Sequence, residues 1–180
     1  MPSVQQTYRP LLESVAFAAR AHQGQKRKDG QTPYASHVFR ACLVLRQVFG
    51  VDDPRVLIAA ALHDTLEDTT TDFDDLVEQF GREVAEWVAV LTKDSRLPEE
   101  EREKAYIAGL ARAPWQVKAA KLADIFDNLM DLPSTPPEKH GKTLKKLRRY
   151  LDALASEPAE PVRRAWQIVS DLHSEMAAKK

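Results

Sequence analysis

One stretch without a polar face places the strongest constraint on the fold. Residues 54–68 read PRVLIAAALHDTLED, and every side chain from Val56 to Leu62 is apolar. A helix that is apolar on all sides must be covered on all sides by other parts of the chain. Helical periodicity recurs in nearly every other segment, and alternating strand patterns are absent. We therefore predict an all-α fold in which this helix is fully buried.

Glycine, proline and capping residues predict where the helices begin and end. Thr32 is the expected N-cap of a helix that starts at Pro33, and Gly81 is expected to split a pair of helices. These signals predict roughly eight helices in one domain, residues 1–180, a length sufficient for one hydrophobic core. The other expected helices cover residues 8–22, 54–68, 115–132, 142–155 and 159–178.

Composition excludes several classes of function. The formal net charge of −1 over 180 residues gives no overall bias toward nucleic acid or membrane. No apolar run approaches the roughly 18 residues of a membrane-spanning helix, and no N-terminal targeting segment is visible. The single cysteine, Cys42, rules out an internal disulfide framework. We expect a cytoplasmic protein that binds a small molecule, with neither nucleic acid nor membrane as partner, and of undetermined oligomeric state.

Four polar residues directly follow the apolar stretch: His63, Asp64, Glu67 and Asp68. If the helix continues, i, i+4 spacing places His63 with Glu67 and Asp64 with Asp68. Burying an unpaired carboxylate costs several kcal/mol, and acids at a helix C-terminus oppose the helix dipole. A bound cation would offset that cost. The alternative is a solvated acidic turn.

Two more side chains are candidates to complete a metal site. His37 follows a break in the helical pattern, and Asp124 lies in KLADIFDN, residues 121–128. Each has an ordinary alternative explanation: His37 as a core residue, and Asp124 on the polar side of an amphipathic surface helix. Together with His63 and Asp64 they give two imidazoles and two carboxylates, which suit Mn²⁺, Fe²⁺ or Zn²⁺.

Such a metal would lower the pKa of a bound water and polarise a phosphoryl oxygen. Glu67 and Asp68 would then be placed to orient or deprotonate the water. Three cations, Lys26, Arg27 and Lys28, precede the helix that bears His37. They form either a solvated turn or an anion-binding lip, in which Arg27 stacks on a base or grips phosphate. A cationic lip beside a metal centre predicts a phosphate-bearing substrate.

Three motifs in this order carry a family resemblance: RKDGQTPYASH (27–37), HDTLED (63–68) and KLADIFDN (121–128). They resemble the HD-superfamily hydrolase domain of the RelA/SpoT alarmone enzymes, and most of all the small, hydrolase-only alarmone hydrolases similar to the metazoan SpoT-type enzyme. The resemblance implies a set of site residues. It implies one Mn²⁺ per chain on His37, His63, Asp64 and Asp124, a catalytic acid pair of Glu67 and Asp68, and substrate contacts from Arg27, Lys28 and Asn128.

The resemblance also implies a reaction, the hydrolysis of the 3′-pyrophosphate of ppGpp or pppGpp to GDP or GTP and pyrophosphate. Two alternatives stay open: a related phosphohydrolase acting on (p)ppApp or on the 2′-phosphate of NADPH, and a catalytically silent nucleotide-binding regulator. The chain departs from the family in several places, among them Val38, where a proline commonly follows the histidine. Asp127 adds an acid near the site, and residues 93–100 end in acids where some relatives place a phosphate-gripping lysine. Arg96, Arg102 or Lys146 is the expected replacement for that lysine.

Overall fold

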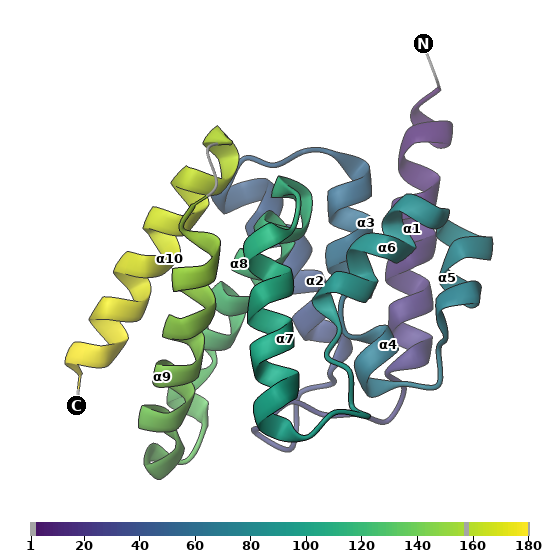
Figure 1. Cartoon of the computed structure of the whole chain (residues 1–180). Helices are drawn as coiled ribbons and strands as arrows, with labels where there is room; N and C mark the ends of the chain where they lie inside the picture. Colours follow the sequence, from purple (N-terminus) through teal and green to yellow (C-terminus); the bar gives the residue numbers. More distant parts are fainter. Residues whose placement is uncertain (1–2, 157–158, 180) are drawn as a thin grey trace.

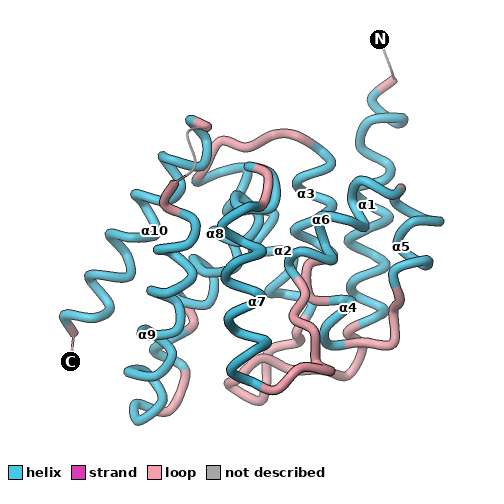
Figure 2. The backbone as a smooth tube through the Cα atoms, in the orientation of Figure 1, coloured by secondary structure: helices cyan, strands magenta, loops and turns pink. Residues whose placement is uncertain are grey.

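The computed structural model describes residues 3–156 and 159–179. Residues 1, 2, 157, 158 and 180 of the expected 1–180 domain therefore lie outside the described residues. Over the described part of the chain the regular elements are all helical, which confirms the all-α prediction (Figures 1 and 2). None of these helices is long and apolar enough to cross a membrane. The elements are α1 (Val4–Ala21), α2 (Ala35–Leu43), the π-helical η1 (Val44–Val48), α3 (Pro54–Leu62), α4 (Thr65–Asp68), α5 (Phe73–Phe80), α6 (Arg82–Leu91), α7 (Glu99–Arg112), α8 (Trp115–Met130), the short η2 (Leu132–Ser134), α9 (Pro137–Leu154) and α10 (Glu160–Ala178).

Helix α3 is buried as its sequence predicts. Every residue from Val56 to Leu62 is buried, and helices α1, α2, α6 and α8 pack around them. The carboxylate of Asp53 caps the helix by accepting the main-chain N–H of Arg55, and Pro54 occupies the first turn. Because α3 is covered on all sides, His63 directly after it is buried and Asp64 is partly buried, whereas Glu67 and Asp68 are exposed.

The single helix expected over residues 54–68 is wrong. Helix α3 ends at Leu62, and α4 begins only at Thr65. The hydroxyl of Thr65 donates to the Leu62 carbonyl at 2.7 Å, which offers the chain a local alternative to the regular helical bond. The break is mild, because the Asp68 N–H still donates to the Asp64 carbonyl at 2.9 Å. His63 and Asp64 therefore lie in a turn between two nearly continuous helices.

The predicted start of α2 is also wrong. The helix begins at Ala35, with Tyr34 and not Thr32 at the cap position. The main-chain N–H of Thr32 donates to the carboxylate of Asp29 at 2.9 Å, and its hydroxyl donates to the same group. The main-chain N–H of Arg27 donates to the Thr32 carbonyl at 2.8 Å. These bonds close the loop between α1 and α2 on itself and hold it beside the start of α2.

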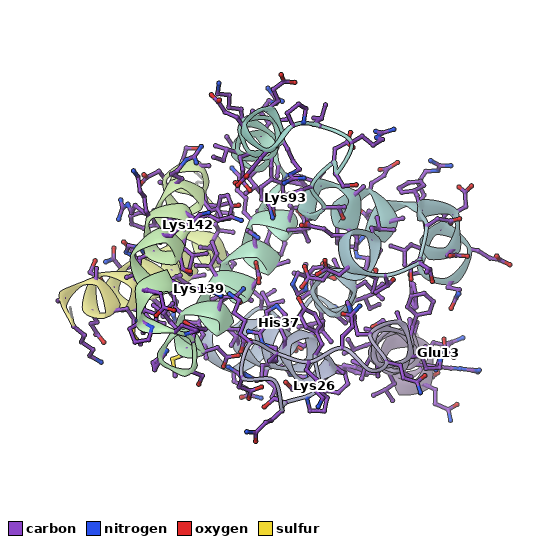
Figure 3. The ribbon with its side chains drawn as sticks, turned by 90° about the horizontal axis from the view of Figure 1, so that it is seen from below. Glu13, Lys26, His37, Lys93, Lys139 and Lys142 are labelled. Carbon is purple, nitrogen blue, oxygen red and sulfur yellow. The ribbon has the colours of Figure 1, made fainter. Side chains whose placement is uncertain are left out.

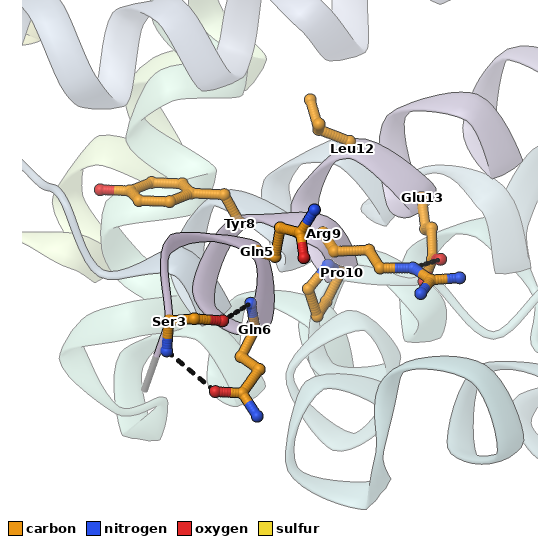
Figure 4. Close-up of a pocket in the computed structure, with 8 residues that line it drawn as sticks. All are labelled: Ser3, Gln5, Gln6, Tyr8, Arg9, Pro10, Leu12 and Glu13. Carbon is orange, nitrogen blue, oxygen red and sulfur yellow. Dashed lines mark hydrogen bonds and ion pairs between the residues drawn. The ribbon is translucent and has the colours of Figure 1, made fainter. Parts of the chain in front are cut away.

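Helix α1 starts at Val4, earlier than expected, because a capping box forms at its N-terminus (Figure 4). The Ser3 hydroxyl accepts the Gln6 N–H at 3.2 Å, and the Gln6 side chain accepts the Ser3 N–H at 2.8 Å. The groove along these first turns measures about 920 Å³. Its one acid, Glu13, is paired with Arg9 at 2.7 Å. The described residues that line this groove form no cluster of catalytic groups.

The two C-terminal helices cover α8 and α7. Helix α10 packs along α8, and α9 packs against α7 (Figure 1). The helix expected over residues 142–155 begins earlier, as α9 at Pro137, a residue that the first turn of a helix accepts. As a result, Lys142 and Lys146 lie on well-formed turns of α9, and both line the cavity described below.

Candidate active site

The four predicted metal ligands converge in the structure. His37 lies in the first turn of α2, His63 and Asp64 lie between α3 and α4, and Asp124 lies within α8. Nε2 of His37 is 3.2 Å from Oδ1 of Asp124 and 3.5 Å from Oδ2 of Asp64. Nε2 of His63 is 2.8 Å from the same Asp64 oxygen and 3.7 Å from Oδ1 of Asp124. His37, His63 and Asp124 each offer a ligand atom within 4.8 Å of the others, so they can hold a metal ion.

Both imidazoles are oriented with Nε2 toward this cluster. Nδ1 of His37 lies 2.6 Å from Oδ2 of Asp127, and Nδ1 of His63 lies 2.8 Å from the Ala60 carbonyl. Because both of these oxygens accept a hydrogen bond, each neutral ring carries its hydrogen on Nδ1 and a lone pair on Nε2. Nε2 of His63 is buried and makes no well-aligned hydrogen bond, although Oδ2 of Asp64 lies only 2.8 Å away. A buried imidazole nitrogen that faces two carboxylates without a hydrogen bond fits a metal ligand.

Asp127 has a structural role that the sequence did not reveal. Its carboxylate is buried between the Nδ1 of His37 and the guanidinium of Arg40, whose Nε lies 2.5 Å from Oδ1. The alternative of an amphipathic surface helix for Asp124 is wrong, because α8 is buried on nearly all sides. Asp127 therefore orients His37, in the arrangement by which carboxylates fix metal-binding histidines.

Arg27 lies inside the protein and not on an open lip. Only 7% of its surface is exposed. Its guanidinium donates to Oδ2 of Asp131 at 2.9 Å and to Oδ1 of Asn128 at 3.2 Å, and it lies 5.6 Å from the ring centre of Tyr34. Asn128 in turn donates to Oδ1 of Asp124 at 2.5 Å. The expected contact of Arg27 with a nucleotide base stays a prediction, and it requires the guanidinium to leave these partners.

A cavity of about 280 Å³ opens over the cluster. In the view of Figure 3, His37 lies between Lys93 on one side and Lys26 on the other, with Lys139 and Lys142 to a third side. The cationic lining outweighs the acidic lining by two charges, so the cavity attracts anions. Its charged lining residues are Lys28, Lys93, Lys121, Lys142 and Lys146, together with Asp64, Glu67 and Asp124.

The two predicted catalytic acids lie in different environments. Glu67 lines the cavity, and its carboxylate accepts the main-chain N–H of Lys93 at 3.1 Å. Asp68 lies on the same turn but is not part of the cavity lining. Burial, together with repulsion from Asp64 and Glu67, raises the pKa of Asp68. Glu67 is therefore the acid that faces the cavity, and Asp68 is the acid that keeps its proton more readily.

Sequence reasoning missed two lysines on the inner wall. Nζ of Lys121 lies 2.7 Å from Oδ2 of Asp124, and Nζ of Lys93 lies 3.5 Å from Oε1 of Glu67. The i, i+3 spacing of Lys121 and Asp124 was a usable signal in the sequence. Lys93 gave no local signal. Arg96, one of the expected replacements for the family's lysine, instead pairs at the surface with Asp94 at 2.7 Å.

The positive and negative charges of the cluster balance one another. Burial would lower the pKa of His37, but hydrogen bonds to Asp124, Asp127 and Asp64 outweigh it and raise the pKa to about 9. The pKa of His63 is also raised, against the effect of burial, by Asp64 and Asp124. Burial acts to raise the pKa values of Asp64 and Asp124. These pKa values nevertheless lie well below the usual range, because the nearby histidines and Lys121 stabilise the ionised carboxylates.

These shifts predict that metal binding releases protons. A metal must displace the proton from each Nε2, so the metal affinity should rise with pH up to about pH 9, where His37 loses its proton in the metal-free protein. For the same reason, the stability that the raised pKa of His37 gives the metal-free protein is complete below pH 6.5 and is lost as the pH rises through about 9. Calorimetric titration with Mn²⁺ at pH 7, in two buffers of different ionisation enthalpy, should show release of roughly one proton per imidazole. Zero release would contradict the protonated cluster.

A lysine-lined cavity lies over two imidazoles and two carboxylates. These features define a class of helical domains in which histidine and aspartate side chains can hold a metal ion beside an anionic ligand. Within that class, the chain belongs to the HD domain family, whose family model matches residues 14–157. The predicted family resemblance is thereby confirmed.

Named relatives cover most of the chain. The guanosine-3′,5′-bis(diphosphate) 3′-pyrophosphohydrolase MESH1 of Homo sapiens is 41% identical over 143 residues, which are 79% of this chain and 79% of the relative. The protein of the same name from Danio rerio is 39% identical over 143 residues, 79% of this chain and 78% of the relative. A solved structure described as a metazoan ortholog of SpoT that hydrolyzes ppGpp and plays a role in starvation responses matches with a TM-score of 0.79 and 32% identity. The match covers 95% of this chain and 97% of the other.

Proposed function

We propose that this protein is a metal-dependent hydrolase that removes the 3′-pyrophosphate of ppGpp or pppGpp, with residues 1–180 acting as one HD-type phosphohydrolase domain. The observation that carries the proposal is the convergence of His37, His63, Asp64 and Asp124 below a cavity lined by five lysines. The relatives named as 3′-pyrophosphohydrolases support the choice of substrate. A cytoplasmic location, without nucleic acid or membrane as partner, completes the proposal.

One Mn²⁺ per chain would be held by Nε2 of His37 and His63 and by the carboxylates of Asp64 and Asp124. This donor set of nitrogen and oxygen suits Mn²⁺, with other divalent metals as competitors, and the buried Nε2 of His63, which makes no well-aligned hydrogen bond, supports it. When bound there, the metal would supply a water of lowered pKa and polarise a phosphoryl oxygen.

The chain's own residues would handle the protons. In the reaction, a water oxygen bonds to the proximal phosphorus of the 3′-diphosphate, and the bond from that phosphorus to the nucleoside 3′-oxygen breaks. Glu67 faces the cavity and is placed to take the proton from the water. Asp68, with its raised pKa, is the group that would return a proton for the leaving 3′-oxygen. Lys28, Asn128 and Lys146 line the cavity as the proposed substrate contacts, with Asn128 toward the sugar.

A substrate panel tests this function. Purified protein with Mn²⁺ should hydrolyse ppGpp or pppGpp with a higher kcat/KM than (p)ppApp or NADPH, because that ratio measures discrimination between substrates. Pyrophosphate release distinguishes alarmone hydrolysis from removal of a single phosphate. A higher kcat/KM for (p)ppApp or NADPH would reassign the substrate. Tight nucleotide binding without any turnover would instead support the catalytically silent regulator.

A further inference from the structure

Two lysines converge on the inner wall of the cavity between two tyrosine rings. The side chains of Lys93 and Lys121 are only 15% and 8% exposed. Nζ of Lys93 lies 4.7 Å from the ring centre of Tyr106, and Nζ of Lys121 lies 5.0 Å from that of Tyr150. Ring faces stabilise ammonium groups that are removed from water. The chain thus keeps two positive charges in a largely buried position that both rings share.

The acids beside these lysines do not fully neutralise the two ammonium groups once a metal and the reacting water are bound. Lys121 pairs with Asp124 and Lys93 pairs with Glu67. The proposed function assigns Asp124 to the metal and Glu67 to the water. Burial and repulsion from Lys121 also lower the pKa of Lys93, so the ammonium group of Lys93 is poorly compensated. Burial acts to lower the pKa of Lys121 as well, but Asp124 raises it above the usual range, so Lys121 depends on Asp124 for its compensation. A metal-loaded site therefore presents an excess of positive charge at this wall.

The tyrosines also limit the movement of the two lysines. The Tyr150 hydroxyl donates to Oε2 of Glu103 at 2.7 Å, and the rings of Tyr106 and Tyr150 meet edge to face at 5.4 Å between centres. A lysine held between fixed rings loses less conformational freedom when it binds a ligand than an exposed lysine does. Low exposure also strengthens its attraction to an anion relative to water. These properties distinguish a built anion site from scattered surface lysines.

We propose that Lys93 and Lys121 form a subsite for the distal phosphate of the 3′-diphosphate, and that the subsite retains inorganic pyrophosphate after hydrolysis. This inference rests on the proposed function. Lys121 adjoins the metal ligand Asp124, and Lys93 adjoins Glu67, so an anion that touches both extends from the reacting centre toward the tyrosines. In the view of Figure 3, Lys26 lies on the opposite side of His37 from Lys93. Lys28, from the same loop, lines the cavity, which leaves a cation for the phosphates at the 5′ end of the nucleotide.

Lys93 is the better residue for a test. Its main-chain N–H holds the Glu67 carboxylate at 3.1 Å in any variant, so a side-chain change tests the ammonium group alone. Lys93→Met keeps the aliphatic stem and removes the charge, while Lys93→Arg keeps the charge. Lys104→Met is the matched control, because Lys104 is 68% exposed on α7 and does not line the cavity.

The measurement is the dissociation constant of inorganic pyrophosphate, by calorimetry on the Mn²⁺-loaded protein, with orthophosphate as the comparison anion. Wild-type protein should bind pyrophosphate more tightly than orthophosphate. Lys93→Met should weaken pyrophosphate binding roughly 10- to 100-fold, as expected for one hydrogen bond between charged groups. Lys93→Arg should lose less affinity for pyrophosphate than Lys93→Met does. Lys104→Met should bind pyrophosphate as tightly as the wild-type protein. Metal content should stay constant throughout.

Unchanged pyrophosphate binding in Lys93→Met would overturn the subsite, and so would wild-type protein that binds no pyrophosphate. Loss of binding on Lys142→Met but not on Lys93→Met would also overturn it, by moving the anion to the outer part of the cavity. If Lys93→Met fails to fold in a thermal melt, Lys93→Gln gives the same comparison. The readout needs no turnover. Failure to hydrolyse ppGpp would therefore refute the proposed function, whereas the pyrophosphate-binding result would still decide whether the subsite exists.

Discussion

Replacing Asp64 by alanine should lower the rate of ppGpp hydrolysis about a thousand-fold or more, since a catalytic metal contributes several kcal/mol of transition-state stabilisation. The reason lies in the position of one oxygen. Oδ2 of Asp64 is 2.8 Å from Nε2 of His63, 3.5 Å from Nε2 of His37 and 2.5 Å from the hydroxyl of Tyr34. Its loss would remove a proposed metal ligand and a negative charge, and would leave Asp124 as the one carboxylate of the proposed ligand set.

Metal content and pyrophosphate release should fall together in this variant. Treatment of wild-type protein with a chelator should give the same loss of activity. Added Mn²⁺ should restore the activity of the wild-type protein but not that of Asp64→Ala. Asp52→Ala is the matched control, because the Asp52 side chain is 58% exposed and pairs only at the surface with Arg46. Full activity in metal-stripped wild type would exclude a metal-dependent reaction, and full activity in Asp64→Ala would exclude this ligand.

The sequence predicted the core of the site because its signals are local. An entirely apolar helix that ends in His63 and Asp64 has to deliver them into the interior, and α3 does so. It could not predict the turn between α3 and α4, because that turn depends on which carbonyl the Thr65 hydroxyl meets. Nor could it place Lys93, which reaches the cavity because α6 packs against α8 and because its Nζ lies beside the rings of Tyr106 and Tyr150.

Helix α8 shows a second limit of reasoning from one segment. A helical wheel tells which residues share a side of a helix, but not how many neighbours surround it. The polar side of α8 looked like a solvent face, yet Lys118, Lys121, Asp124 and Asp127 are all buried. The two acids are tolerated there because side chains of other elements pair with them, as His37 and Arg40 do with Asp127. Lys121 is instead paired with Asp124 of the same helix. The partners of Asp127 lie about ninety residues away in the chain and leave no local pattern.

Replacing Glu67 by glutamine should separate catalysis from metal binding. The amide has nearly the same shape and can still accept the main-chain N–H of Lys93, so the turn that carries residue 67 should stay in place. It cannot take a proton from water, however. We expect kcat to fall roughly 10²- to 10⁴-fold, the range for loss of a general base, while the bound Mn²⁺ per chain matches wild type.

The comparison with Asp68→Asn shows how the two acids divide the work. If Asp68 returns a proton to the leaving oxygen, its amide variant should lose activity chiefly on the low-pH side of the wild-type profile, where the wild-type carboxyl still carries its proton. On the high-pH side the wild-type carboxyl has lost that proton, so the two proteins should differ less. Glu67→Gln should instead lower the rate at every pH, because no ionised form of the side chain remains. Single-turnover rates across pH, with metal content measured in the same samples, test both statements. A Glu67→Gln variant with wild-type kcat and full metal content would remove Glu67 from the mechanism, since its place on the cavity wall would then serve only to hold Lys93.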